Sequence, residues 1–276
     1  MSDPRVILTA GFNRARHVLA TTELLWRSGV SVEGLLVVSP YSWKRLKSFV
    51  QREGMRAVWE AVPRLLGLDT GTIEQGDSDP FTRLYEKYDI ERQSLKSWAK
   101  ARNVTFRSVT SINDEGAVEF VEATGPDWVI YGGGGILRRA FIDAADGRIL
   151  NAHSGPLPEV RGMNASEWSI LLGYEPTVTI HLIDQGIDTG GILSKHPVRV
   201  YEEDSIEHLR KRCVAVGVEA LCDTVLNPPD VLPDSPEGAG EHRQCFVLAP
   251  ALRELLGKKI DEGKERRETI TSQKRQ

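Results

Sequence analysis

The protein has 276 residues, of which 40% are hydrophobic, 27% charged and 7% aromatic. This composition is ordinary for a soluble globular protein, and it excludes a wholly disordered chain, a collagen-like chain and a coiled coil. The 35 basic residues nearly balance the 39 acidic ones, and the net charge of −4 is too small to indicate binding to nucleic acid or to a membrane surface.

The first 38 residues predict a strand, a helix and a second strand. Residues 5–10 form a continuous apolar run, which suits a strand buried on both faces of a parallel sheet. A helical spacing of apolar residues follows and ends near Gly29, and residues 30–38 supply the next strand. Strands that alternate with helices predict a parallel sheet covered on both faces.

Residues 41–103 interrupt this alternation, and we predict that they form a helical insertion. A basic amphipathic helix begins at Trp43, a second helical stretch covers residues 58–65, and residues 69–80 read as a polar loop. A further helix includes Trp98. We expect the insertion to present a solvated helical face, with a lid or a partner surface as the alternatives.

The alternation returns after residue 103. The strand expected at residues 127–131 runs into four consecutive glycines, Gly132 to Gly135. Together these patterns predict an α/β fold with an open, mostly parallel, Rossmann-like sheet. The remaining strands are expected at residues 104–109, 149–153, 177–182 and 192–193, with helices at 114–123 and 137–145.

The pattern changes at residue 204, where a short, mostly helical C-terminal extension is expected. Asp204 and Glu207 have the spacing of a capping pair, and the helix after them stops before Asn227. Residues 228–243 are rich in proline, glycine and acidic residues and read as a loop. The last twenty residues are expected to be a mobile tail.

Three polar side chains indicate where chemistry takes place. Asn151 and His153 are two positions apart at the end of a predicted strand, so they project from the same face. Asp188 lies in a glycine-rich loop, residues 184–191, that can bring it beside His153. Open α/β sheets place their ligands at the carboxyl ends of the strands.

These three residue types suit acyl transfer to an amine. His153 can take the proton of the attacking amine, because an imidazole titrates near neutral pH. The side-chain amide of Asn151 can donate a hydrogen bond to the oxyanion of the tetrahedral intermediate. Asp188 can orient the imidazole and stabilise its charged form. His181 is interpreted as a structural residue of its strand.

The same residues belong to a longer motif, Asn151-x-His153-x-x-x-Leu157-Pro158, with Arg161-Gly162 and then Gly186-Ile187-Asp188-Thr189-Gly190. This motif closely resembles the folate-dependent formyltransferases, whose members act on methionyl-tRNA, glycinamide ribonucleotide or sugar nucleotides. The similarity is strongest over residues 126–200. It implies that Asn151, His153 and Asp188 are the catalytic residues.

The resemblance also implies a co-substrate, 10-formyltetrahydrofolate. No metal is expected, because His153, His181 and His196 lack the spacing of metal ligands. The pterin ring of the co-substrate is expected to bind two segments of the chain. The resemblance further implies a formyltransferase catalytic domain at residues 1–203, which includes the insertion, and a helical extension at 204–276. The residues expected to hold the pterin are Gly133, Gly134, Gly135, Ile136 and Leu137 in one segment, and Asp184, Gly186 and Ile187 in the other.

The acceptor is expected to be a primary amine, on a sugar nucleotide or on a specialised metabolite. Residues 11–16 hold one glycine and two arginines, whereas the glycinamide ribonucleotide enzymes have a glycine-rich phosphate turn there. The residues after 200 look too few and too helical for the barrel of the transfer-RNA enzymes. A formyltetrahydrofolate deformylase and a non-catalytic folate-binding module are the alternatives, and a nicotinamide enzyme is disfavoured by the glycine spacing.

The remaining expectations concern surroundings and partners. No signal-peptide pattern and no apolar run of membrane-spanning length is found, so a cytoplasmic location is expected, with no membrane and no nucleic-acid partner. The three cysteines lack metal or disulfide spacing and are expected to be buried hydrophobic residues. A homodimer through the C-terminal helices is expected.

Overall fold

The computed structural model describes residues 3–38, 79–201 and 204–249, together with residues 252 and 256. The helices expected from Trp43 and at residues 58–65, and the expected mobile tail, lie outside this part of the chain. The chain divides into two compact units, and the division expected at residue 203 stays a prediction. The first unit comprises Met1–Ser78, Tyr85–Asn151 and Leu221–Pro228, and the second comprises Asp79–Leu84, Ala152–Ala220 and Pro229–Gln276.

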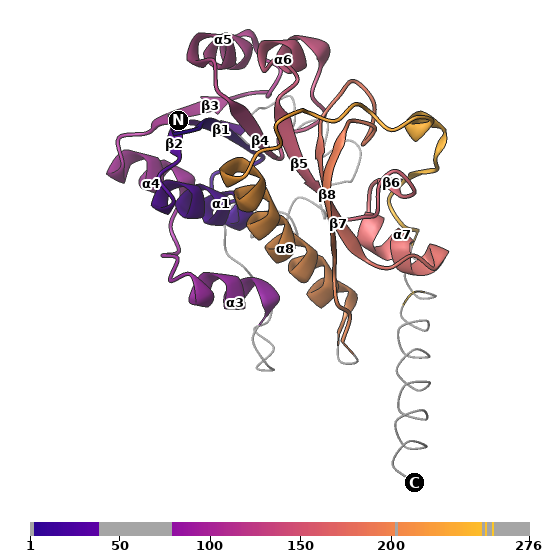
Figure 1. Ribbon diagram of the computed structural model, residues 1–276. Coiled ribbons are helices and arrows are strands. Elements are labelled where there is room, and N and C mark those ends of the chain that lie inside the picture. The colour runs from indigo at the N-terminus through magenta and orange to yellow at the C-terminus, as the bar shows by residue number, and fades with distance from the viewer. Residues whose placement is uncertain (1–2, 39–78, 202–203, 250–251, 253–255, 257–276) are drawn as a thin grey trace, which may run out of the picture. The chain divides into compact units, whose positions relative to one another are not determined.

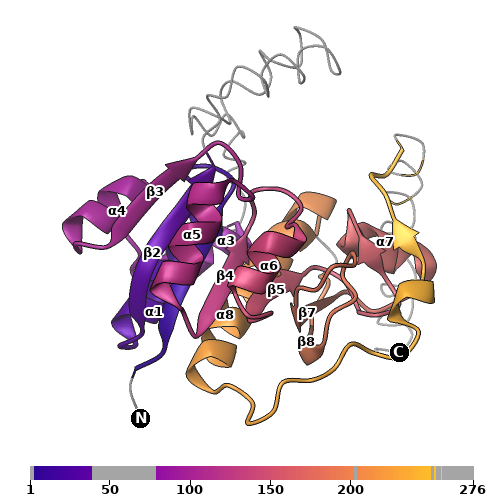
Figure 2. The ribbon, with the colours of Figure 1, turned by 90° about the horizontal axis from the view of Figure 1, so that it is seen from above.

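The first unit is built on a parallel sheet (Figure 2). Its strands pair in the order β3-β2-β1-β4-β5, and each of the four pairs is parallel. Five of the six residues of β1 are buried, as expected for a strand covered on both faces. The strands are β1 (Arg5–Ala10), β2 (Ser31–Val38), β3 (Thr105–Val109), β4 (Trp128–Gly132) and β5 (Ile149–His153), whose last two residues belong to the second unit.

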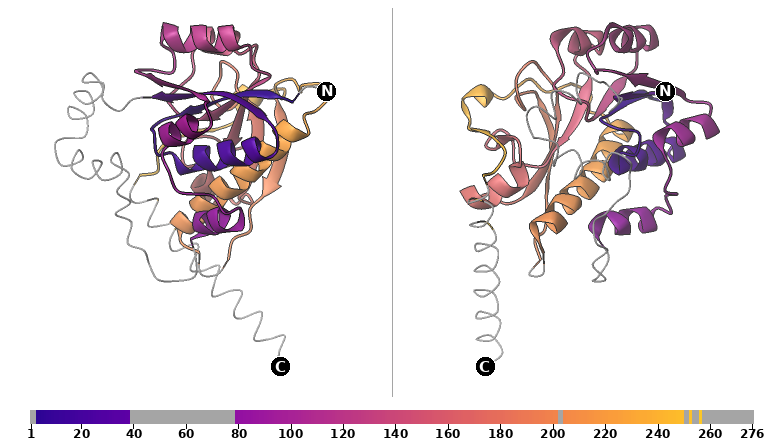
Figure 3. Two further views of the ribbon diagram at one scale, coloured as in Figure 1. Left: turned by 90° about the vertical axis from the view of Figure 1, so that its left-hand side faces the viewer. Right: turned by 180° about the vertical axis from the view of Figure 1, so that it is seen from behind.

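Four helices of the first unit cover both faces of this sheet. Helices α5 (Glu115–Thr124) and α6 (Arg139–Ala144) lie on one face, and α1 (Arg16–Arg27) and α4 (Leu95–Ala101) lie on the other (Figures 1 and 3). The side chain of Ser94 caps α4 by accepting a hydrogen bond from the amide of Ser97 at 3.0 Å. The predicted α/β alternation is therefore confirmed in this unit.

Helix α3 (Pro80–Lys87) was not predicted. It begins with proline, a residue that suits the first helical position because its missing N–H needs no partner there. Phe81, Leu84 and Tyr85 have helical spacing and are buried. This apolar stripe covers only one turn and directly follows a polar segment, so the sequence pattern does not distinguish the helix from the loop before it.

The second unit contains two small sets of strands. Strands β7 (Thr177–Leu182) and β8 (Ile192–Pro197) pair antiparallel, and all six residues of β7 are buried. Strands β6 (Arg161–Gly162) and β9 (Gln244–Cys245) form a short parallel ribbon. Helix α7 (Ala165–Leu172) follows β6 directly. The strands were predicted to be mostly parallel, and the antiparallel pair β7–β8 agrees with that prediction.

Helix α8 (Ile206–Leu226) ends where the sequence predicts, but its cap differs from the prediction. Ser205 accepts the hydrogen bond of the His208 amide at 3.2 Å, so Ser205 is the capping residue. Asp204 instead accepts from the amide of Tyr201 at 2.8 Å and pairs with Arg212. The predicted capping pair of Asp204 and Glu207 is therefore wrong, because the guanidinium two turns along the helix binds the carboxylate. No helix in the described part of the chain combines the length and apolarity needed to cross a bilayer.

Candidate active site

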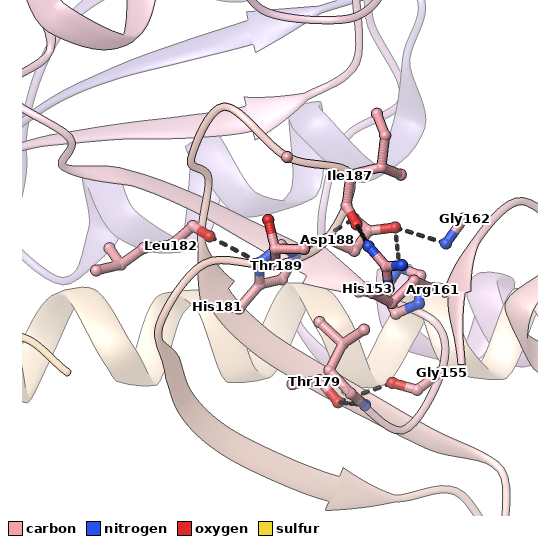
Figure 4. A network of polar contacts seen from close by, with 12 residues as sticks. His153, Gly155, Arg161, Gly162, Thr179, His181, Leu182, Ile187, Asp188 and Thr189 are labelled. Atoms are coloured by element: carbon pink, nitrogen blue, oxygen red, sulfur yellow. Dashed lines mark hydrogen bonds and ion pairs between the residues drawn. The ribbon is translucent and has the colours of Figure 1, made fainter. Parts of the chain in front are cut away.

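His153 ends strand β5, and its ring is only 7% exposed. Its Nε2 atom lies 2.8 Å from the carbonyl oxygen of Val160. A carbonyl oxygen only accepts hydrogen bonds, so Nε2 carries the hydrogen. Nδ1 is therefore the nitrogen left to exchange a proton, and it lies 3.4 Å from Oδ2 of Asp188 (Figure 4).

Asp188 lies in the loop between β7 and β8, which consists of residues 183–191. Its side chain is 16% exposed, and Oδ2 accepts a hydrogen bond from the amide of Gly162 at 2.8 Å. Its backbone has φ = 53°, a left-handed conformation that is uncommon for residues other than glycine. The structure thus brings His153 and Asp188 together although 35 positions separate them in the sequence.

The rest of this loop is held by its own contacts. Asp184 accepts hydrogen bonds from the amide of Gly186 at 3.0 Å and from the hydroxyl of Thr189 at 2.6 Å. A Cβ atom on Gly186 would lie 2.0 Å from the Thr189 hydroxyl, and one on Gly190 would lie 2.0 Å from the carbonyl oxygen of Leu182. Glycine is therefore required at both positions for steric reasons, as the glycine spacing predicts.

His181, a residue of β7, lies next to Asp188 as well. Its Nδ1–H donates to the carbonyl of Leu182 at 2.8 Å, and its Nε2 lies 3.7 Å from Oδ1 of Asp188 (Figure 4). Burial, followed by the nearby charge of His153, lowers the pKa of His181 to about 4. His181 is therefore a neutral imidazole near pH 7, in contact range of the same carboxylate as His153.

The sequence did not predict that His181 is part of the site. It could have been suspected from its position, because His181 is the only imidazole within the buried strand Thr177–Leu182. Thr179, two positions earlier on the same strand, donates to the carbonyl of Gly155 at 2.7 Å and accepts from the amide of Leu157 at 3.3 Å. Strand β7 therefore supports both the Asp188 side and the His153 side of this cluster.

The glycine segment after β4 belongs to the first unit. Gly133, Gly134 and Gly135 have φ values of 108°, 127° and 107°, which side chains other than hydrogen strongly disfavour. The carbonyl of Gly133 accepts from the hydroxyl of Thr9 at 3.0 Å, which fixes the start of the segment. Ile136 is 75% exposed, and Leu137 is buried. An exposed isoleucine beside bare backbone is the kind of surface that an aromatic ligand can cover.

The predicted site residues therefore fall into two groups. His153, Asp184, Gly186, Ile187 and Asp188 belong to the second unit. Asn151, which stands two positions before His153 on β5, and residues 133–137 belong to the first unit. Among the described residues, no group of three or more His, Cys, Asp or Glu side chains is arranged to hold a metal ion.

The chain is similar to known proteins over most of this region. The family model described as formyl transferase matches residues 78–225, more than half of the chain. A methionyl-tRNA formyltransferase of Anaeromyxobacter dehalogenans is 31% identical over 138 residues, which are 49% of this chain and 44% of that protein. One from Koribacter versatilis is 32% identical over 167 residues, 59% of this chain and 52% of that protein. The chain thus spans about half the length of these relatives.

The fold has solved counterparts too. A phosphoribosylglycinamide formyltransferase from Streptococcus pneumoniae superposes with a TM-score of 0.51 and 19% identity, over 81% of this chain and 98% of the other. At that level of identity the likeness concerns the fold. It agrees with the α/β architecture described above.

Proposed function

This chain belongs to the formyl transferase family, and from that membership we propose that it transfers the formyl group of 10-formyltetrahydrofolate to a primary amine. The observation that carries the proposal is the approach of His153 Nδ1 to the Asp188 carboxylate at 3.4 Å, within the residues that match the family. An imidazole whose free nitrogen faces a carboxylate can take up a proton and keep the resulting charge stabilised.

In the proposed reaction, the acceptor nitrogen attacks the formyl carbon. A bond forms between them, and Nδ1 of His153 takes the proton that the amine loses. The side-chain amide of Asn151 donates a hydrogen bond to the oxygen that becomes negative. The bond between the formyl carbon and N10 of the folate then breaks, and His153 returns the proton to that nitrogen. Asp188 stabilises the imidazolium between the two proton transfers.

We assign the donor to residues 133–137 and to the loop residues Asp184, Gly186 and Ile187. Support for the first segment comes from the bare backbone of the three glycines and from the exposed side chain of Ile136. Support for the second comes from the hydrogen bonds that fix the loop from within. A fixed site loses less conformational entropy when it binds its ligand.

For the acceptor we propose an amine on a sugar nucleotide or on a specialised metabolite. Residues 204–249 fold into α8, the short 3-10 helix Ala239–Glu241 and the two-residue strand β9. This structure differs from the strand-rich barrel that the resemblance associates with transfer RNA. We also propose a cytoplasmic homodimer. The three cysteines are buried and form no disulfide with one another, which suits a reducing compartment.

The test is mass spectrometry of an amine panel that includes nucleotide-linked amino sugars, incubated with the protein and 10-formyltetrahydrofolate. We expect one amine class to gain one formyl group. Asn151→Ala should lower the rate about 100-fold or more, as expected for loss of an oxyanion donor. Asp188→Asn, which keeps the shape of the side chain, should also abolish most turnover.

The same assay separates the alternatives. Release of formate without an acceptor, at a rate comparable to transfer, would identify a deformylase. Tight binding of the folate with neither formate nor formylated amine would identify a binding module. Full activity of both variants would contradict the assignment of Asn151 and Asp188.

A further inference from the structure

A buried cation, Arg161, joins the loop that carries Asp188 to a segment far along the chain. Its side chain is 6% exposed, and its terminal nitrogens donate to backbone carbonyls only. One nitrogen donates to Ile187 at 3.0 Å, and the other donates to Gly240 at 2.9 Å and to His242 at 2.6 Å (Figure 4 shows the first of these). One guanidinium therefore ties the residue before Asp188 to a segment 79 to 81 positions after Arg161.

That segment, residues 233–248, is called the strap here. Its first residues contact both ends of the Asp188 loop. The hydroxyl of Ser235 donates to Oδ2 of Asp184 at 3.2 Å. A Cβ atom on Gly191 would lie 2.0 Å from the carbonyl oxygen of Pro233, so the two backbones touch at this glycine. The strap thus meets the loop independently of Arg161.

Further along, the strap packs on the strand that binds Asp188. The amide of Gly162 donates to Asp188 at 2.8 Å, and the next amide, that of Met163, donates to the carbonyl of Cys245 at 3.0 Å. A Cβ atom on Gly162 would lie 2.2 Å from that carbonyl oxygen. Gly162 of strand β6 therefore contacts both Cys245 of the strap and the carboxylate of Asp188.

The strap is also fixed to helix α7 and to the residue before it. The indole N–H of Trp168 donates to the carbonyl of Phe246 at 2.8 Å, and the amide of Leu248 donates to the side chain of Asn164 at 3.0 Å. Cys245 is 3% exposed and packs with Val160 and Ala165. These contacts give the strap its own anchor, so it can act as a support.

We propose that Arg161 is a positioning residue for the reaction and that the strap is part of the catalytic apparatus. Asp188 has the left-handed conformation φ = 53°, which persists only where the surroundings determine it. Arg161 and the strap supply those surroundings, and they keep the carboxylate at Nδ1 of His153. This inference rests on the proposed function, because it assigns Arg161 a role in the same reaction.

The test compares Arg161→Met with Arg212→Lys in the full chain. Arg212 is the matched control: it is also largely buried, and it donates to the carbonyl of Arg199 at 2.8 Å and pairs with Asp204. For each protein, kcat, the KM for the donor and the hydrogen exchange of the amides at 184–191 and 240–248 are measured.

We expect Arg161→Met to lower kcat about 100-fold, the effect of a misplaced catalytic group. The KM for the donor should rise by a smaller factor, and both amide segments should exchange faster. Arg161→Lys should recover part of kcat, because an ammonium group can still reach one of the carbonyls. Arg212→Lys should lower the stability while leaving kcat and both exchange rates as in the wild type.

A kcat within about threefold of the wild type in Arg161→Met would overturn the proposal, whether or not the exchange changes. If Arg161→Met does not fold, Trp168→Phe replaces it, since it removes one hydrogen bond of the strap. It should lower kcat about fivefold, and an unchanged kcat with faster exchange at 245–248 would reject the role of the strap.

Failure of the proposed function gives a different result. In that case the wild type neither transfers nor hydrolyses the formyl group, while the exchange measurements still apply. Faster exchange at 184–191 in Arg161→Met, and not in Arg212→Lys, would then show that Arg161 holds the loop. Equal exchange in both variants would reject the structural part as well.

Discussion

The Nε2 atom of His181 lies 3.7 Å from Oδ1 of Asp188, and Nδ1 of His153 lies 3.4 Å from Oδ2 of the same carboxylate. Nδ1 of His181 is occupied by its hydrogen bond to the carbonyl of Leu182, so Nε2 is the position that acid protonates. Burial opposes this protonation and lowers the pKa of His181 to about 4. The carboxylate therefore lies 3.4 Å from a ring nitrogen of His153 and 3.7 Å from one of His181, and the His181 ring is neutral near pH 7.

Acid should destabilise the protein through His181. The unfolded chain binds a proton at this residue below a pKa of about 6.5, whereas the folded chain does so only below about 4. The free energy of unfolding therefore decreases as the pH falls from 6.5 to 4. At pH 5 this decrease amounts to about 2 kcal/mol. Urea unfolding at pH 7 and pH 5 should show a smaller loss in His181→Asn than in the wild type. Equal losses in the two proteins would contradict this reading.

Ile136 should contribute to donor binding without contributing to stability. Its side chain is 75% exposed, so Ile136→Ser changes little in the free protein. Covering an isoleucine with a ligand is worth about 1.5 kcal/mol or more, so tetrahydrofolate should bind about tenfold more weakly. Calorimetric titration measures this. Val231→Ser, at a position 81% exposed, is the control and should bind the folate as the wild type does.

Two glycines should respond to alanine in opposite ways. Gly190→Ala places a methyl group 2.0 Å from the carbonyl oxygen of Leu182, so the Asp188 loop must shift and both stability and turnover should fall. Gly116 lies in α5 with nothing within 4 Å of its added Cβ. Gly116→Ala should therefore stabilise the protein, by up to about 1 kcal/mol. Thermal unfolding and kcat of the two variants test the contrast, and similar melting temperatures would refute it.

Glu23 should be needed for the stability of the first unit. Burial by itself raises the pKa of Glu23. Hydrogen bonds from Trp98 and Arg27 and the charge of Arg102 together lower it by more, so the net shift of the pKa is downward. The carboxylate accepts from the indole N–H of Trp98 at 2.5 Å and lies 2.8 Å from Arg102. Its contribution is present above the ordinary carboxyl pKa and is lost as the pH falls through the lowered one.

Glu23→Gln should cost about 3 kcal/mol of unfolding free energy, because it leaves Arg102 without its charge partner in a largely buried place. Glu33→Gln is the matched control. Glu33 lies 3.5 Å from Arg5, and the two side chains are 32% and 46% exposed. Removal of this exposed ion pair should lower the free energy of unfolding by less than about 1 kcal/mol. Denaturant unfolding measures both, and a similar effect of the two changes would refute the role of Glu23.

Strands β1 and β2 were predictable because burial leaves a continuous apolar run in the sequence. The two-residue strands β6 and β9 were not predicted, since two residues are too few to form such a run. The approach of Asp188 to His153 was predictable from the motif and from the loop glycines. The cap of α8 was not, because the choice between Ser205 and Asp204 depends on Arg212, which lies two turns away. The hydrogen bonds of Arg161 were not predictable either, because no local sequence pattern marks the carbonyls of Gly240 and His242 as its acceptors.

The β6–β9 ribbon also bears on how the protein is made. Gln244 pairs with Arg161 across 83 positions, so this ribbon cannot form before residues 244 and 245 have been made. The loop around Asp188 therefore obtains its full set of contacts only after residues 240–245 have left the ribosome.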